Sequence, residues 1–138
     1  MRVFLDTNVL VSAVATRGIC ADVLREVLVS HRLVVSSDLL REIEKVLHEK
    51  VKVPQSLISD FIALIEEDAL LSEASPLSDI KIRDRRDVPI LSAALNAGAD
   101  LFVTGDKELL ELRKVGDTEI VSPRSFWEKL KAVHSDEK

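Results

Sequence analysis

Three aspartates stand where short apolar segments give way to helical stretches. Asp6 directly follows one such segment, Asp106 follows another by one turn, and Asp87 opens a helix of its own. In open α/β sheets, the carboxyl ends of the strands and the starts of the following helices form the ligand crevice, so the three carboxylates are expected to meet at one edge of a sheet. Each aspartate also suits a helix N-cap, which is a purely structural role. Asp87 suits it least, because Pro89 has no N–H to donate.

A further carboxylate lies on the helix predicted over residues 38–49. The apolar stripe of this helix centres near Ile43, and at about 100° per residue Glu42 and Glu44 lie on its two borders. Either side chain could point into a crevice while the helix stays packed, so the geometry leaves the choice open. A solvated surface position is the structural alternative for both.

Carboxylates without imidazole or thiolate neighbours suit a hard cation. Cys20 is the only cysteine, which excludes a disulfide framework and a Cys-rich zinc site, and the three histidines are far apart in the sequence. Oxygen ligands favour Mg²⁺ or Mn²⁺, which would relieve the repulsion between the carboxylates and activate water at a phosphodiester. The residues alone therefore indicate a metal-assisted hydrolase of the phosphoryl-transfer type.

The charge balance restricts how the chain could bind nucleic acid. With 19 basic and 24 acidic residues, the net charge is −5, so such binding must use a local basic patch. Residues 81–86 carry four positive charges beside Asp87 and fit the backbone of a polyanion. The alternative is a solvated loop whose arginines pair with Asp79 and Asp84.

The elements that position these residues alternate between strand and helix. The chain has 138 residues, 46% of them apolar, which fits one globular domain. No apolar run reaches the ~18 residues of a transmembrane helix, and we expect a cytoplasmic protein. The alternation predicts an α/β fold with three layers (α/β/α) and a mostly parallel central sheet of about four to five strands. We predict strands at 2–5, 33–35, 101–103 and 120–121, a weaker one near 70–74, helices at 9–15, 20–30, 38–49, 54–68, 88–97, 107–113 and from 123 onward, and a loop at 75–86.

The acidic segments, taken in order, resemble those of PIN-domain ribonucleases. The similarity covers about residues 1–130, predicted as a single nuclease domain, and leaves 131–138 as a charged tail. It is closest to the VapC-like branch, the toxins of toxin–antitoxin pairs. Each motif alone is weak, but the set at this spacing is specific. The matching segments are DTNVLVSA at 6–13, VVSSDLLREI at 34–43, DVPIL at 87–91, ADLFVTGDK at 99–107 and VSPRSF at 121–126.

This resemblance assigns roles to individual positions. It selects Glu42 over Glu44, and it matches Asn8 and Thr104 to supporting polar positions that would orient a carboxylate or a metal-bound water. The catalytic and metal-binding acids that it implies are Asp6, Glu42, Asp87 and Asp106.

One segment departs from the pattern of the branch. Relatives often carry a run of acids just before the helix that starts here at Asp87, whereas this chain has Arg-Asp-Arg-Arg. Asp84 is therefore a possible substitute for Asp87 as the third acid. The expected contacts with the RNA backbone are Arg83, Arg85, Arg86 and Lys107.

The activity implied by the resemblance is endoribonuclease cleavage of RNA with Mg²⁺ or Mn²⁺ as cofactor, leaving 5′-phosphate and 3′-hydroxyl ends. The implied partners are an RNA substrate, a cognate antitoxin protein and a second copy in a homodimer, with no membrane. One alternative is a catalytically silent PIN-like module that binds RNA or a partner, although such a module has no need of four repelling carboxylates. Another is a haloacid-dehalogenase-like phosphatase, which needs a second acid where Asn8 stands.

Overall fold

Short apolar segments pair into one sheet, in a computed structural model that describes residues 1–73 and 87–136. The strand order is β3-β2-β1-β4-β6-β5, and every neighbouring pair is parallel except β5 with β6. This confirms the predicted parallel sheet. The strands are β1 (Arg2–Leu5), β2 (Arg32–Val35), β3 (Leu70–Leu71), β4 (Leu101–Val103), β5 (Lys114–Val115) and β6 (Thr118–Val121).

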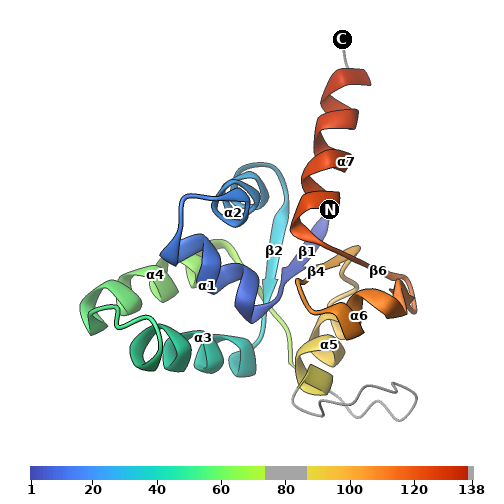
Figure 1. The fold of residues 1–138 in the computed structure, drawn as a ribbon. Helices are drawn as coiled ribbons and strands as arrows, with labels where there is room; N and C mark the ends of the chain where they lie inside the picture. Colours follow the sequence, from blue (N-terminus) through green and yellow to red (C-terminus); the bar gives the residue numbers. More distant parts are fainter. Residues whose placement is uncertain (74–86, 137–138) are drawn as a thin grey trace.

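Helices connect the parallel strands (Figure 1). Polar side chains at the strand ends begin several of them: Asp6, Ser36 and Asp106 each accept a hydrogen bond from a backbone N–H of the helix that follows. The helices are α1 (Thr7–Ala15), α2 (Ile19–Ser30), α3 (Ser37–Glu49), α4 (Gln55–Asp68), α5 (Asp87–Asn96), α6 (Lys107–Leu112) and α7 (Pro123–Asp136).

Both faces of the central strands are covered. The last three residues of β1 and of β2 and all three of β4 are buried, although successive side chains of a strand point to opposite faces. Helices therefore pack on both sides, which confirms the α/β/α class. Phe4 and Phe102 stack on adjacent strands, with ring centroids 5.3 Å apart, and anchor the middle of the core.

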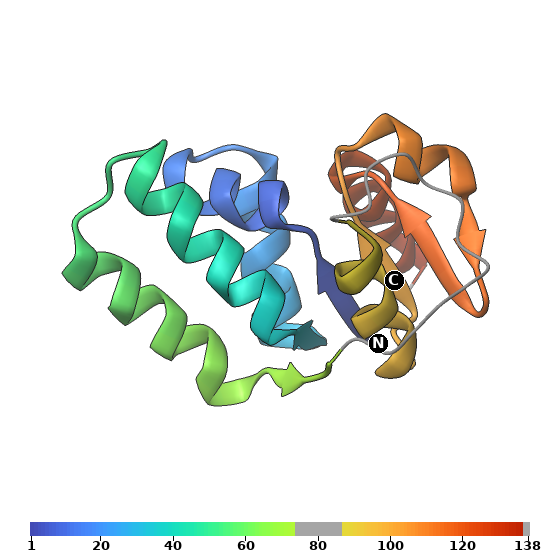
Figure 2. The same cartoon turned by 90° about the horizontal axis from the view of Figure 1, so that it is seen from below.

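The helices differ in their distance from the centre of the fold. α3 lies between α1 and α4, so α4 is at the outer side of the helical layer (Figure 2). No single helix within the described residues is long and apolar enough to span a membrane. α1 and α2 would pass that test only as a pair, and they meet at an angle of 106°.

The structure differs from the predicted elements in a few places. The weak strand near 70–74 is present as β3, and β5 is an additional two-residue strand that forms a hairpin with β6. The last helix continues to Asp136, six residues beyond the predicted end of the domain. The predicted loop at 75–86 lies outside the described residues.

Candidate active site

The parallel register brings Asp6 and Thr104 side by side. Leu5 pairs with Val103, and the backbone N–H of Asp6 donates to the carbonyl oxygen of Val103 at 2.9 Å. Both residues therefore follow the carboxyl ends of adjacent strands, where α/β proteins place ligand sites. The register thus places Asp6 beside the segment that leads to Asp106, whereas the predicted meeting of the aspartates at one edge stays a prediction.

The carboxylate of Asp6 is buried and held at both oxygens. Thr104 Oγ1 donates to Oδ2 at 2.7 Å, and the backbone N–H of Thr7 donates to Oδ1 at 2.8 Å. Only 6% of Asp6 is exposed and Thr104 is fully buried. The side chain is thus both the N-cap of α1 and a fixed acid at the sheet edge.

Thr104 connects this acid to the next one. The backbone N–H of Asp106 donates to Thr104 Oγ1 at 3.0 Å, so one hydroxyl bridges the two aspartates. Asp106 Oδ1 accepts the N–H groups of Glu108 at 2.8 Å and Leu109 at 3.4 Å, which makes Asp106 the N-cap of α6. Capping and the candidate chemistry therefore use the same side chains.

Glu42 is the third acid that acts at this edge. It is exposed on α3, and its negative charge, with that of Asp106, raises the pKa of Asp6. Burial is the largest cause of this raised pKa, and the hydrogen bonds from Thr104 and Thr7 oppose it.

Glu44 occupies a different environment. Its Oε1 accepts from Gln55 Nε2 of α4 at 3.2 Å. It makes no contribution to the raised pKa of Asp6, in contrast to Glu42. The packing of α4 therefore separates two glutamates that are equivalent on the helix alone, and it favours Glu42 for the site.

Thr7 is a residue that the sequence reasoning missed. It is 3% exposed, and its Oγ1 is buried and has no hydrogen-bond partner among the residues that the structure describes. Buried hydroxyls normally have a partner, often an ordered water. An unsatisfied oxygen one residue from Asp6 indicates that a water or an ion belongs near this edge. The Asp-Thr-Asn motif placed Thr7 here, but only the packing reveals that its hydroxyl is unsatisfied.

The remaining predicted site residues divide into two groups. Asn8 is exposed on α1 and Lys107 is exposed as the first residue of α6, next to Asp106. Asp87 is the first residue of α5, but its side chain is outside what the structure describes. The same holds for the whole of residues 83–86, which include Asp84 and the three predicted RNA-contacting arginines, so their roles stay predictions.

The described acids provide the oxygen ligands that a hard cation prefers, but they do not by themselves form a complete metal site. The three described carboxylates and the Thr7 hydroxyl offer only oxygen ligands, as Mg²⁺ and Mn²⁺ prefer. Within residues 1–73 and 87–136, no three His, Cys, Asp or Glu side chains are grouped so that they could hold a metal ion. The four-acid metal site therefore stays a prediction that includes Asp87 or Asp84.

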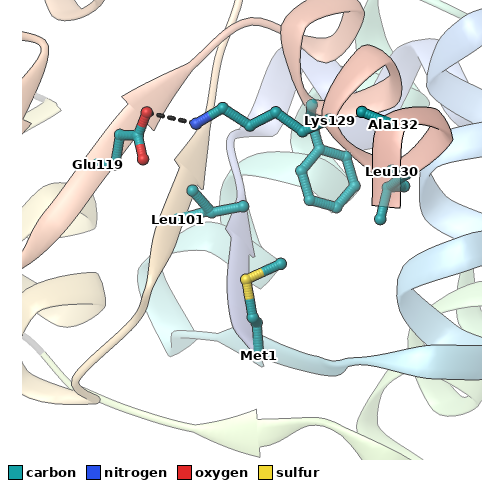
Figure 3. Close-up of a pocket in the computed structure, with 7 residues that line it drawn as sticks. Met1, Leu101, Glu119, Lys129, Leu130 and Ala132 are labelled. Carbon is teal, nitrogen blue, oxygen red and sulfur yellow. Dashed lines mark hydrogen bonds and ion pairs between the residues drawn. The ribbon is translucent and has the colours of Figure 1, made fainter. Parts of the chain in front are cut away.

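Two hollows differ in their lining. One of about 370 Å³ begins at Glu42 and runs along α3, where Lys45 and Lys50 also line it. The other, of about 400 Å³, is apolar and contains none of the predicted site residues (Figure 3). Met1 and Leu101, at the amino ends of β1 and β4, form its floor with residues of α7, and the ion pair of Glu119 with Lys129 closes one side.

Comparisons with known proteins agree with this geometry. A search of the curated proteins finds no match. The solved structure of VapBC2 from Rickettsia felis, bound to a DNA fragment from its promoter, contains a chain of similar fold: the TM-score is 0.63 and the identity 15%, covering 88% of this chain and 98% of that chain. The structure of VapBC-1 from nontypeable Haemophilus influenzae also contains a chain of similar fold. The TM-score is 0.61 and the sequence identity 20%, and the match covers 90% of this chain and 99% of that chain. The family model of the PIN domain matches residues 2–108. The chain therefore belongs to the PIN-domain family.

Proposed function

We propose that this chain is a metal-dependent ribonuclease that hydrolyses RNA phosphodiester bonds, and that it is the toxin of a toxin–antitoxin pair. The observation that carries the proposal is the bridged pair of aspartates at the sheet edge, with the charge of Glu42 acting on it. A buried carboxylate beside two others is costly for a purely structural cap. It is expected where a cation binds.

The cofactor in this proposal is Mg²⁺ or Mn²⁺. Asp6, Glu42 and Asp106 would hold it, together with Asp87 or its substitute Asp84. When bound, the ion supplies an activated water and neutralises charge on the phosphodiester. Thr104 keeps the carboxylate of Asp6 oriented. Asn8, at the start of α1, would orient another carboxylate or a metal-bound water.

The proposed partners follow from the family and from the structural neighbours. Both neighbouring structures are VapBC complexes, which supports a cognate antitoxin for this chain as well. The RNA backbone would contact Lys107 and the basic segment 83–86, and a homodimer in the cytoplasm completes the proposal.

The test is cleavage of a mixed-sequence single-stranded RNA with Mn²⁺, with Mg²⁺ or with a chelator. Wild type is expected to cut only with metal and to leave 5′-phosphate and 3′-hydroxyl ends. Asp6→Asn and Asp106→Asn should both abolish cutting and keep the fold, as judged by circular dichroism. Cutting that persists in both variants would remove these acids from the mechanism.

A chain that does not cut is distinguished by its metal binding. Mn²⁺ binding that is lost in Asp6→Asn would indicate a nuclease with a strict target sequence. The absence of both cutting and Mn²⁺ binding would favour the silent binding module.

A further inference from the structure

The two residues that follow β3 lie beside the start of α3. β3 runs parallel to β2, and the backbone N–H of Ser72 donates to the carbonyl oxygen of Val35 at 2.8 Å. The residue after Val35 is the N-cap of α3, Ser36. Ser72 and Glu73 therefore lie at the carboxyl ends of the parallel strands, the same edge of the sheet at which Asp6 follows β1.

Glu73 binds the first turn of α3 from outside the helix. Its Oε1 accepts from the hydroxyl of Ser37 at 2.7 Å and from the backbone N–H of the same residue at 3.3 Å. Ser37 is the first residue of α3, where a backbone N–H has no partner within the helix and a carboxylate is favourable at the positive end of the helix dipole. Ser36 already caps this helix by accepting from the N–H of Leu39 at 3.1 Å. What Glu73 adds is therefore a connection between α3 and a segment 36 residues further along the chain.

The same two residues also bind the last turn of α5. Ser72 Oγ donates to the carbonyl oxygen of Ala93 at 2.7 Å, and Asn96 Nδ2 donates to the carbonyl oxygen of Glu73 at 2.7 Å. Figure 2 shows β3, in lime, leading toward α5, in olive. Because α5 ends at Asn96, Ser72 and Glu73 link the start of α3 to the end of α5.

This link matters for the candidate site because the position of Glu42 depends on its helix. Asp6 is held by hydrogen bonds at both oxygens, and Asp106 accepts from two backbone N–H groups. Glu42 is exposed, and within the described part of the chain its side chain makes no hydrogen bond. Its position relative to the two aspartates is therefore set by the packing of α3.

We infer that Glu73 is a positioning residue of the candidate site: together with Ser72 it fixes α3 against α5, and so keeps Glu42 and the acid predicted at the start of α5 in place for the cation. This role rests on the proposed function. Glu73 touches neither the cation nor the RNA in this role and acts only through the two helices.

Two substitutions of Glu73 separate the link from the charge. Glu73→Ala loses the oxygen that accepts from Ser37, and we expect kcat for RNA cleavage to fall about tenfold or more, because small displacements of reacting groups are costly. KM should not change, since Glu73 touches no RNA, whereas the affinity for Mn²⁺ should fall about tenfold. Glu73→Gln keeps an oxygen for Ser37 and should retain both cleavage and Mn²⁺ binding.

The matched control is Glu67→Ala, which removes the same charge from an exposed position on α4 and should behave as wild type does. Equal kcat and equal Mn²⁺ affinity in Glu73→Ala and wild type would overturn the inference. A glutamine variant as impaired as the alanine variant would also overturn it, since the charge of Glu73 and not the link would then matter.

Ser37→Ala tests the link from the side of α3. It removes the hydroxyl donor and leaves the carboxylate of Glu73 in place. Ser37→Ala should lower kcat as Glu73→Ala does, and the double variant should be no worse than Glu73→Ala alone, because both changes break one interaction. Losses that multiply in the double variant would show two independent effects and contradict the link.

Amide hydrogen exchange separates this inference from the proposed function. In chelator and without RNA, Glu73→Ala should exchange faster than wild type and Glu67→Ala in the first turn of α3 and in the last turn of α5. Faster exchange in a chain that neither cuts RNA nor binds Mn²⁺ would keep the link between the helices and reject the nuclease. RNA cleavage by wild type, with unchanged exchange in Glu73→Ala, would keep the nuclease and reject the link.

Discussion

Asp6 combines two roles that differ in their energetic demands. As the cap of α1, its carboxylate is stabilised by the N–H of Thr7. As an acid buried near Glu42 and Asp106, its charge is penalised, and the pKa is raised from 3.8. The cap alone does not require this burial. Without a cation, the buried charge of Asp6 therefore destabilises the folded state, and a bound cation would remove this destabilisation.

This cost predicts that Asp6→Asn is more stable than wild type in chelator at pH 7. The raised pKa means that the folded state binds the proton more tightly than the unfolded state does, so the contribution of Asp6 to stability falls as pH rises above 3.8. The asparagine side chain of Asp6→Asn does not ionise, so this loss of stability with rising pH is removed, while its amide oxygen still accepts a hydrogen bond. We expect Asp6→Asn to unfold at a higher urea concentration than wild type at pH 7, and this difference should shrink as the pH is lowered toward 4.

Urea unfolding at several pH values, with and without Mg²⁺, measures this effect. Mg²⁺ should stabilise wild type and leave Asp6→Asn unchanged. Asp117→Asn, at an exposed turn, is the control for the loss of one negative charge and should unfold at the same urea concentration as wild type at pH 7. A variant less stable than wild type at neutral pH would contradict the argument from burial and repulsion.

The hydroxyl of Thr104 is the connection between the two aspartates. Thr104→Val keeps the shape but removes the donor to Asp6 and the acceptor for the N–H of Asp106. We expect a loss of about 1–2 kcal/mol in unfolding free energy and reduced RNA cleavage, because both aspartates lose their mutual orientation. Thr104→Ser keeps the hydroxyl and should retain cleavage. Equal cleavage by the valine and serine variants would show that the bridge is not needed.

At the scale of the elements, the sequence was sufficient where apolar periodicity is strong. The buried strands and α2 to α4 were predicted closely. Gly98 follows the end of α5 in the left-handed region, at φ 65°, a conformation that glycine adopts readily after a helix. β5 was missed because two residues carry no periodicity. Its signal was the Gly116–Asp117 pair between β5 and β6, a two-residue hairpin connection in which Gly116 has φ 58°.

The site shows the same division between what is local and what depends on packing. Asp6 and Asp106 follow strands, so their position at one edge could be derived from the alternation alone. Glu42 and Glu44 could not be separated in this way, because the difference arises from Gln55 on another helix. The unsatisfied hydroxyl of Thr7 likewise depends on neighbours that the sequence does not specify.

This pair of glutamates supplies a matched comparison within one helix. Glu42→Gln is expected to lower RNA cleavage by about tenfold or more, because it removes one of the charges that act at Asp6. Glu44→Gln leaves the site intact and should cleave as wild type does. Both substitutions conserve size, so circular dichroism should show an unchanged fold. Equal cleavage by the two variants would mean that α3 contributes no acid to the reaction.

At the scale of the whole molecule, the charges oppose the proposed substrate. The net charge of −5 and the acids of α4 repel a polyanion, so RNA must approach by a limited basic path. Lys107, exposed beside Asp106, and Arg41 and Lys45, exposed on the same helix as Glu42, are described cations near the candidate acids along the chain. The stretch from Lys81 to Arg86 is the densest basic segment of the sequence next to a predicted acid.

Because the basic residues are few and clustered, we expect a small number of them to determine how the affinity for RNA depends on salt concentration. Each phosphate contact that is lost should make the slope of log affinity against log salt shallower by about 0.7 for single-stranded RNA. Arg85→Ala/Arg86→Ala should therefore weaken binding and reduce the slope by about 1.4 if each arginine contacts one phosphate. Arg32→Ala is the control, since Arg32 is exposed at the amino end of β2, away from the site edge. Binding is measured in chelator, which prevents cleavage. Equal slopes for wild type and the double variant would show that RNA follows another path across the molecule.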